Sequence, residues 1–142
     1  MRLRELASAD TAAVHELLRE CRLPTEGVPE DAALFLVAEI AGRIVGVAGL
    51  ELHGSDGLLR SVAVSPEHRD GRVASQLVSE VEVRAGPLGA KRVYLLTETA
   101  ERFFARRGYT RVDRSLAPRR IAMSREFAAI CPASAALMFR EG

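Results

Sequence analysis

Cysteine is scarce in this sequence: only Cys21 and Cys131 are present, far apart in the chain. Two cysteines are too few for a disulfide framework or for a zinc site built from cysteines. Neither charge sign is in excess, with 20 basic and 19 acidic residues, so nothing favours binding to nucleic acid or to an anionic membrane surface. We therefore expect a small polar ligand, and no metal, nucleic-acid partner or membrane partner.

Long apolar runs are also missing. No stretch approaches the roughly 20 apolar residues that span a bilayer. The first residues, MRLRELASADTAAVHELL, lack an apolar core followed by a small-residue cleavage site, and the sequence therefore predicts a cytoplasmic protein. With 142 residues and 48% hydrophobic composition, the chain has the size of one ordinary domain, so we expect residues 1–142 to form a single domain.

Apolar periodicity predicts a mixed α/β fold with a sheet flanked by helices. Strands are expected at residues 1–5, 34–39, 44–52, 58–64, 92–96, 108–113 and 135–139, and helices around 13–18, 73–85, 100–107 and, weakly, 117–130. Ser8 or Asp10 can cap the first helix. On the second helix the apolar residues share one face, which leaves toward solvent Ser75, Ser79, Glu82 and Arg84.

The stretch SVAVSPEHRDGRVASQLV, residues 61–78, leads from a strand through a short charged loop into a helix. Such a loop presents unpaired backbone N–H groups and the positive end of the helix dipole. Arg69 and Arg72 add donors suited to phosphate oxygens, while Gly71 and Ala74 keep the backbone accessible. The loop therefore predicts an anion site, and the expected ligand is a pyrophosphate.

The order of these parts resembles the GNAT superfamily of acetyl-CoA-dependent N-acetyltransferases across nearly the whole chain. In that family the phosphate loop reads Arg or Gln, two residues, Gly, one residue, then Gly or Ala. Arg69, Val73 and Ala74 match this pattern in register. Arg72 stands where the first glycine is usual, and Gly71 lies one place early. The resemblance implies a mixed, mostly antiparallel sheet of about seven strands and acetyl-CoA as co-substrate.

A second family signature reads AERFFARRGY here, at residues 100–109. Phe104 occupies the position where many members carry a tyrosine that protonates the departing thiolate. The segments RLPTEG at 22–27, LLRSVAV at 58–64, YLLTETAERFFARRGY at 94–109 and REFAAICPASAALM at 125–138 resemble the arsenic-resistance N-acetyltransferases, which are related to N-acetylglutamate synthase-type amino-acid acetyltransferases. This resemblance implies an acetyl transfer to a small amino-acid-like substrate, with a link to arsenic resistance.

The resemblance also implies roles for the strand before the loop. A backbone N–H around Val62 would donate to the thioester carbonyl oxygen, while Ala63 and Val64 pair with the pantetheine arm as a strand would. Thr97, which is also suited to capping the helix that follows it, joins the expected cofactor contacts. The full expected set is Val62, Ala63, Val64, Arg69, Asp70, Gly71, Arg72, Val73, Ala74, Ser75, Thr97 and Phe104.

Acetyl transfer needs a base that removes a proton from the substrate amine. The candidates are Glu51 and His53, which lie on one face of the same strand, and Glu98 after a later strand. We favour Glu51, because a carboxylate in so apolar a strand is either paired or suited to proton removal. Its pairing partner would be Arg60 on the neighbouring strand.

Arg60 interrupts an apolar run, and a buried guanidinium needs an anionic partner. That partner is either the carboxylate of an amino-acid substrate or Glu51, and the expected substrate contacts are Arg60, Glu51 and Ser61. Because Phe104 cannot donate a proton, the thiolate would be protonated by water, Tyr94 or Tyr109, although both tyrosines are also suited to simple packing.

Two other functions compete with this prediction. Arg72 at the glycine position and Phe104 make a non-catalytic acyl-CoA sensor or interaction module an alternative, and acetylation of a protein N-terminus or lysine is a second. Cys131 near Glu126 suggests an arsenical site, but one thiol is a poor ligand set for a soft metal. By analogy of fold, the last strand could pair across a homodimer.

Overall fold

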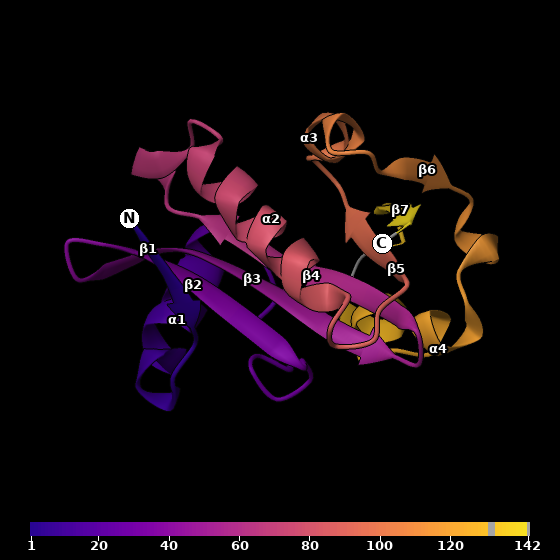
Figure 1. Ribbon diagram of the computed structural model, residues 1–142, viewed down its shortest axis with the longest axis horizontal. Helices are drawn as coiled ribbons and strands as arrows, with labels where there is room; N and C mark the ends of the chain where they lie inside the picture. The colour runs from indigo at the N-terminus through magenta and orange to yellow at the C-terminus, as the bar shows by residue number, and fades with distance from the viewer. Residues whose placement is uncertain (131–132, 142) are drawn as a thin grey trace.

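The computed structural model describes residues 1–130 and 133–141, which form a seven-stranded sheet in the order β1-β2-β3-β4-β5-β7-β6 (Figure 1). The strands are β1 (Arg2–Glu5), β2 (Leu34–Ile40), β3 (Arg43–His53), β4 (Asp56–Val64), β5 (Arg92–Thr97), β6 (Thr110–Val112) and β7 (Ala136–Glu141). Neighbouring strands pair antiparallel except β4 and β5, which are parallel. The prediction of a mixed, mostly antiparallel sheet of about seven strands is confirmed.

Helical segments join these strands. The α-helices are α1 (Thr11–Glu20), α2 (Arg72–Ala85), α3 (Glu101–Arg106) and α4 (Arg119–Ala122). Shorter turns are the 3-10 segments η1 (Ser8–Asp10), η2 (Pro66–His68) and η3 (Arg114–Leu116) and the π-helical segment η4 (Glu126–Ile130). The weak helix predicted at 117–130 is divided into two pieces, α4 and η4.

The two faces of the sheet are covered by different helices (Figure 1). On one face α1 packs through Val14, Leu17 and Leu18 onto Val37, Val47 and Ala63 of the sheet. On the other face α2 packs through Val73, Leu77, Val78 and Val81 onto Leu36, Ala48, Leu50 and Leu59. A third cluster joins Ile121 of α4 to Leu58, Tyr94 and Leu137. Because side chains alternate along a strand, Leu58 faces away from α2.

Three residues of α2 that were expected to face solvent bind Arg107 instead. The Arg107 guanidinium, just after α3, donates from Nη1 to Ser75 Oγ (2.9 Å) and from Nη2 to Ser79 Oγ (2.6 Å). Nη2 also donates to Glu82 Oε1 (3.0 Å). Sequence periodicity could not reveal this contact, since it is made by a side chain from a distant segment of the chain. The network fixes α3 against α2, and thus the wall of the site described below.

Asp10 does not cap α1 as expected but binds Arg4 on β1. Its carboxylate accepts from Arg4 Nη1 (2.7 Å) and Nη2 (3.1 Å), and also from the Ala7 backbone N–H (2.8 Å). Arg4 Nε in turn donates to Glu39 Oε1 on β2 (2.8 Å). The hydrogen bonds from the Arg4 guanidinium lower the pKa of Asp10 to about 2. This ion-pair network fastens the N-terminal strand to the rest of the fold.

Asp10→Asn is expected to lower stability at pH 7 by about 1 kcal/mol and to remove part of the acid sensitivity of the fold. The folded pKa of Asp10 lies below its ordinary value of 3.8. Its contribution is therefore complete above that value and is lost as the pH falls toward 2. Urea unfolding between pH 7 and pH 2.5 measures the difference, with Glu16→Gln on the exposed side of α1 as control. Parallel pH curves for wild type and Asp10→Asn would contradict the assignment.

Candidate functional site

The strand β4 is irregular at Ser61 and Val62. The pairs that flank the irregularity are Gly49 with Arg60 and Val47 with Ala63, so β4 has one residue more than β3 over this stretch. Ser61 has a φ of 57°, in the left-handed region that costs a non-glycine residue free energy. Such a bulge bends a strand and turns its peptide groups. The expected oxyanion donor, the Val62 N–H, therefore lies at a distortion of the sheet.

The strands β4 and β5 pair over only part of their length. The parallel ladder joins Asp56–Leu59 to Arg92–Leu95, and in the described chain it does not continue past Leu59. The later half of β4, which holds Val62–Val64, thus diverges from β5. A divergent strand edge of this kind can accept an extended ligand arm as an added strand.

Gly71 takes the backbone conformation that the start of α2 requires. It has a φ of 93° and immediately precedes the helix, whose first residue is Arg72. The left-handed position is therefore supplied one residue before the usual glycine, and Arg72 adopts ordinary helical geometry. The Arg72 side chain is 85% exposed, with Nε 3.7 Å from Asp70 Oδ2. Asp70 Oδ1 accepts from the Arg72 backbone N–H (3.0 Å).

A cleft of about 430 Å³ opens where α2 begins. Its lining residues are Asp70, Gly71, Arg72, Ser75, Phe103, Arg106 and Arg107. Four of these were expected from the loop, whereas Phe103, Arg106 and Arg107 were missed by the sequence analysis. The two arginines and Phe103 were visible within the AERFFARRGY signature, but only the contact between α3 and α2 brings them to the loop. Three guanidinium groups at a helix N-terminus make this cleft suited to phosphate.

Other residues of the expected cofactor set lie outside this cleft. Arg69 folds back, with Nε donating to the Val64 carbonyl (3.0 Å) and Nη2 to Cys21 Sγ (3.3 Å). Val73 is buried in the core and Ala74 packs at its margin. Among Arg69, Val73 and Ala74, only Arg69 is exposed.

Phe104 and Thr97 have structural partners. Phe104 is 5% exposed and packs edge-to-face on Phe103 and Tyr109, with ring centroids 5.0 Å and 5.4 Å apart. Thr97 Oγ1 accepts from the N–H of Ala100 (3.0 Å), the N-cap residue of α3, so it binds the turn before the helix and does not cap the helix itself. Phe103, the neighbour of Phe104, is the aromatic residue that lines the cleft.

Glu51 and Arg60 form a buried ion pair on the face of the sheet opposite α2. Arg60 Nη1 donates to Glu51 Oε2 at 2.7 Å, and the two side chains are 0% and 4% exposed. Glu51, one of the two partners proposed for Arg60, is thus paired with it in the structure. A guanidinium this deeply buried has no exposed N–H for a substrate carboxylate, so the geometry favours pairing over a substrate clamp.

The other base candidates differ in their surroundings. His53 Nε2 lies 2.7 Å from Glu51 Oε1, and its side chain is 23% exposed. An ionised carboxylate only accepts, so with Glu51 ionised the His53 Nε2 is the donor in this hydrogen bond. Glu98 is exposed and accepts from Ser134 Oγ (3.0 Å). Glu51 and His53 therefore form one hydrogen-bonded unit, and Glu98 stands apart.

Both tyrosines are packed rather than open. Tyr109 donates from its hydroxyl to Glu82 Oε2 (2.8 Å), and burial followed by the Glu82 charge raises the pKa of Tyr109. Tyr94 stacks on Phe139 with ring centroids 5.4 Å apart, and burial raises the pKa of Tyr94 as well. Neither hydroxyl is poised to lose a proton readily near neutral pH.

Residues 1–130 and 133–141 hold no group of three or more His, Cys, Asp or Glu side chains that could bind a metal ion. No helix in this part of the chain is both long and apolar enough to cross a bilayer. Cys131, considered above for arsenical binding, lies outside the described residues. Cys21 is half-buried and donates to the Val64 carbonyl at 3.4 Å.

Three features define the class of α/β transferase domain that the sequence resembles. They are the divergence of β4 from β5, the bulge in β4 and the arginine-lined cleft at the start of α2. The chain belongs to the GNAT acetyltransferase family, because the family model described as an acetyltransferase (GNAT) domain matches residues 31–111. That match covers more than half of the chain.

The relatives of this chain include amino-acid acetyltransferases. The chain is 32% identical over 117 residues to the amino-acid acetyltransferase of Pseudomonas fluorescens and 31% identical to that of Azotobacter vinelandii. Each alignment covers 76% of this chain and 27% of the relative, so the chain spans about a quarter of their length. The predicted resemblance to this group of acetyltransferases is confirmed.

Solved structures of low sequence identity share the fold. N-acetylglutamate synthase from Neisseria gonorrhoeae, complexed with coenzyme A and N-acetyl-glutamate, superposes with a TM-score of 0.85 at 21% identity, over 99% of this chain and 34% of that one. Rv2747 from Mycobacterium tuberculosis, in complex with CoA and NLQ, superposes with a TM-score of 0.83 at 22% identity, over 100% and 99% of the two chains.

Proposed function

We propose that this protein transfers the acetyl group of acetyl-CoA to the amine of a small amino-acid-like compound. The observation that carries the proposal is the divergence of β4 from β5 beyond Leu59, next to the bulge at Ser61 and Val62 and the arginine-lined cleft. Family membership, relatives named amino-acid acetyltransferases and fold neighbours complexed with coenzyme A support it.

The residues present fit acetyl-CoA. The cleft offers Arg72, Arg106 and the first amides of α2 to a diphosphate, and Arg107 adds positive charge while its Nη1 and Nη2 bind Ser75, Ser79 and Glu82. The divergent half of β4 offers an extended edge to the pantetheine arm. The Val62 N–H at the bulge would donate to the thioester oxygen as it gains negative charge. No metal is required by this assignment.

In the proposed reaction the amine nitrogen forms a bond to the acetyl carbon, the carbon–sulfur bond breaks, and coenzyme A leaves as a thiolate that takes up a proton. We assign removal of the amine proton to the hydrogen-bonded unit of Glu51 and His53, acting through water. The Tyr109 hydroxyl is bound to Glu82 and the Tyr94 ring packs on Phe139, so we assign the proton taken up by the thiolate to solvent.

The arrangement favours a small substrate over a protein. Residues 21–33 and 119–128, which we call the two covering segments, are tied together by Arg125, whose Nε and Nη2 each donate to an Asp31 carboxylate oxygen at 2.9 Å. A protein N-terminus or lysine would need a more open site. The cytoplasmic location, a homodimer and a link to arsenic resistance stay predictions.

A thiol-release assay with acetyl-CoA tests the proposal. The amine panel contains free amino acids, glufosinate-like amino acids and organoarsenical amino acids, with calorimetry of coenzyme A binding alongside. We expect micromolar to millimolar KM values for one class of amine. Coenzyme binding without thiol release on any amine would favour the sensor alternative. Absence of coenzyme binding would refute both.

A further inference from the structure

Arg60 contacts four parts of the chain that are separate in sequence. Its Nε donates to Ser61 Oγ in the bulge (3.1 Å), and its Nη1 donates to Glu51 Oε2 on β3 (2.7 Å). Its Nη2 donates to the Glu26 carbonyl in the first covering segment (2.9 Å) and lies 3.2 Å from Glu126 Oε1 in the second. One fully buried guanidinium thus joins the bulge, β3 and both covering segments.

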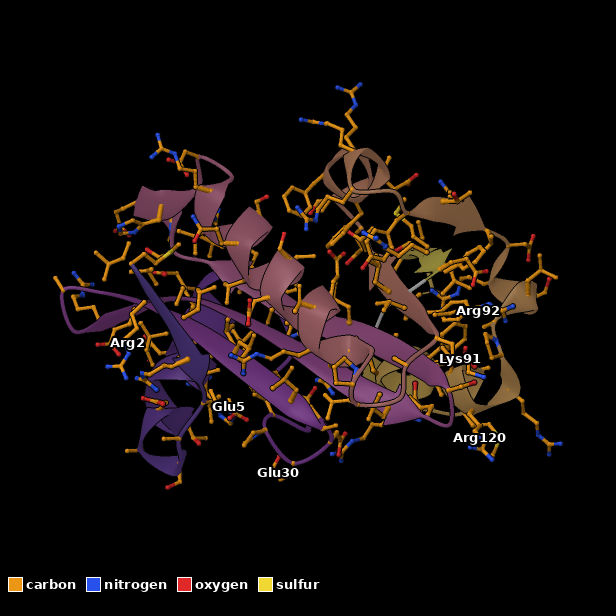
Figure 2. All side chains as sticks on the ribbon, viewed as in Figure 1. Arg2, Glu5, Glu30, Lys91, Arg92 and Arg120 are labelled. Atoms are coloured by element: carbon orange, nitrogen blue, oxygen red, sulfur yellow. The ribbon has the colours of Figure 1, made fainter. Side chains whose placement is uncertain are left out.

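A second link joins the covering segments farther out. The Arg125–Asp31 pair described above is partly exposed, and Asp31 Oδ2 also lies 3.9 Å from Arg60 Nη1. Figure 2 labels Glu30 and Arg120, one charged side chain from each covering segment, at the periphery of the molecule. Arg60 therefore forms the inner connection between the segments and Arg125 the outer one.

The chemistry of the site requires arginine in particular. A buried charge is costly unless its donors are all paired, and the guanidinium is a planar fork with five N–H donors that point in different directions. Lysine presents one compact ammonium and could not bind Ser61, Glu51 and Glu26 at the same time. In Arg60 each of the three guanidinium nitrogens, Nε, Nη1 and Nη2, donates to a different residue.

We propose that Arg60 is a positioning residue for the amine half of the reaction. It holds Ser61 in its left-handed conformation and so fixes the direction of the adjoining Val62 N–H, and it fastens both covering segments over the same side of the sheet. The kinetic part of this inference rests on the proposed function. Because α2 and α3 form the arginine-lined cleft on the opposite face, acetyl-CoA binding depends little on Arg60.

The test compares Arg60→Lys with wild type by steady-state kinetics and by hydrogen exchange. We expect kcat/KM for the amine to fall by about 10- to 100-fold, while KM for acetyl-CoA changes less than about 3-fold. Backbone exchange should accelerate in residues 21–33 and in 119–128 and stay unchanged in α2. Arg4→Lys is the matched control, since Arg4 also bridges two acids from separate elements but lies away from the site.

Unchanged exchange in either covering segment, unchanged amine kinetics, or a KM for acetyl-CoA that rises as much as the KM for the amine would overturn the proposal. If Arg60→Lys does not fold, Glu126→Gln removes one contact and keeps the Glu51–Arg60 pair. Glu126→Gln should accelerate exchange in 119–128 and lower amine kcat/KM by about 3-fold. Exchange and amine kinetics equal to those of wild type in Glu126→Gln would equally overturn the proposal. If wild type acetylates no amine, the proposed function fails, whereas the exchange data still decide whether Arg60 fastens the segments.

Discussion

Replacing Glu51 with methionine is expected to lower the free energy of unfolding by about 3–4 kcal/mol. The substitution leaves the Arg60 guanidinium, whose side chain is 0% exposed, without the carboxylate that its Nη1 binds at 2.7 Å. Glu126 at 3.2 Å and Asp31 at 3.9 Å remain nearby, which keeps the expected loss at the lower end for a broken buried pair. Urea unfolding at pH 7 measures the effect.

The double variant Glu51→Met/Arg60→Met provides the control for this prediction. Two apolar side chains of similar length bury no charge, so most of the lost stability should return. Turnover of the amine should not return, because both the base unit with His53 and the contacts to the covering segments are absent. A single-variant loss below about 1 kcal/mol would mean that the remaining acids suffice for Arg60.

The Glu51–Arg60 pair illustrates how far the sequence alone could lead. Both residues interrupt runs that are otherwise apolar, and a charge in a buried strand must find a partner. Their positions on neighbouring strands made Glu51 one candidate partner of Arg60, and a substrate carboxylate was an equal alternative. The Glu26 carbonyl and Glu126 could not be predicted, since neither periodicity nor spacing brings such distant segments to one side chain.

The distortions that shape the site were invisible for a similar reason. The strands and α2 follow from alternation and helical periodicity, which are local properties. The bulge at Ser61 has no glycine to mark it, and it appears only when β4 is paired with β3. Likewise the polar residues of α2 predicted a solvent-exposed face, whereas in the structure Arg107 binds Ser75 and Ser79 on that face. Tertiary contacts decided both outcomes.

Gly71→Val is expected to weaken coenzyme A binding by about 10- to 100-fold, because the start of α2 depends on a left-handed residue there. A side chain at this position would meet no atom within 4 Å, so the cost arises from the φ of 93° rather than from crowding. To relieve that strain the loop must rotate, which turns the first amides of α2 and Arg72 away from the cleft. Isothermal calorimetry with coenzyme A measures the change.

Gly86 supplies a matched control for this last prediction. It lies at the other end of α2 with an ordinary φ of −57°, and a side chain there also meets nothing within 4 Å. Gly86→Val should leave coenzyme affinity unchanged. Equal affinities for wild type and Gly71→Val would show that the amides at this helix start do not hold the diphosphate.

Asp70→Asn should act in the opposite direction to Gly71→Val and tighten coenzyme A binding by about 3-fold. The substitution removes a negative charge beside the cleft and weakens the competing bond from the Arg72 amide.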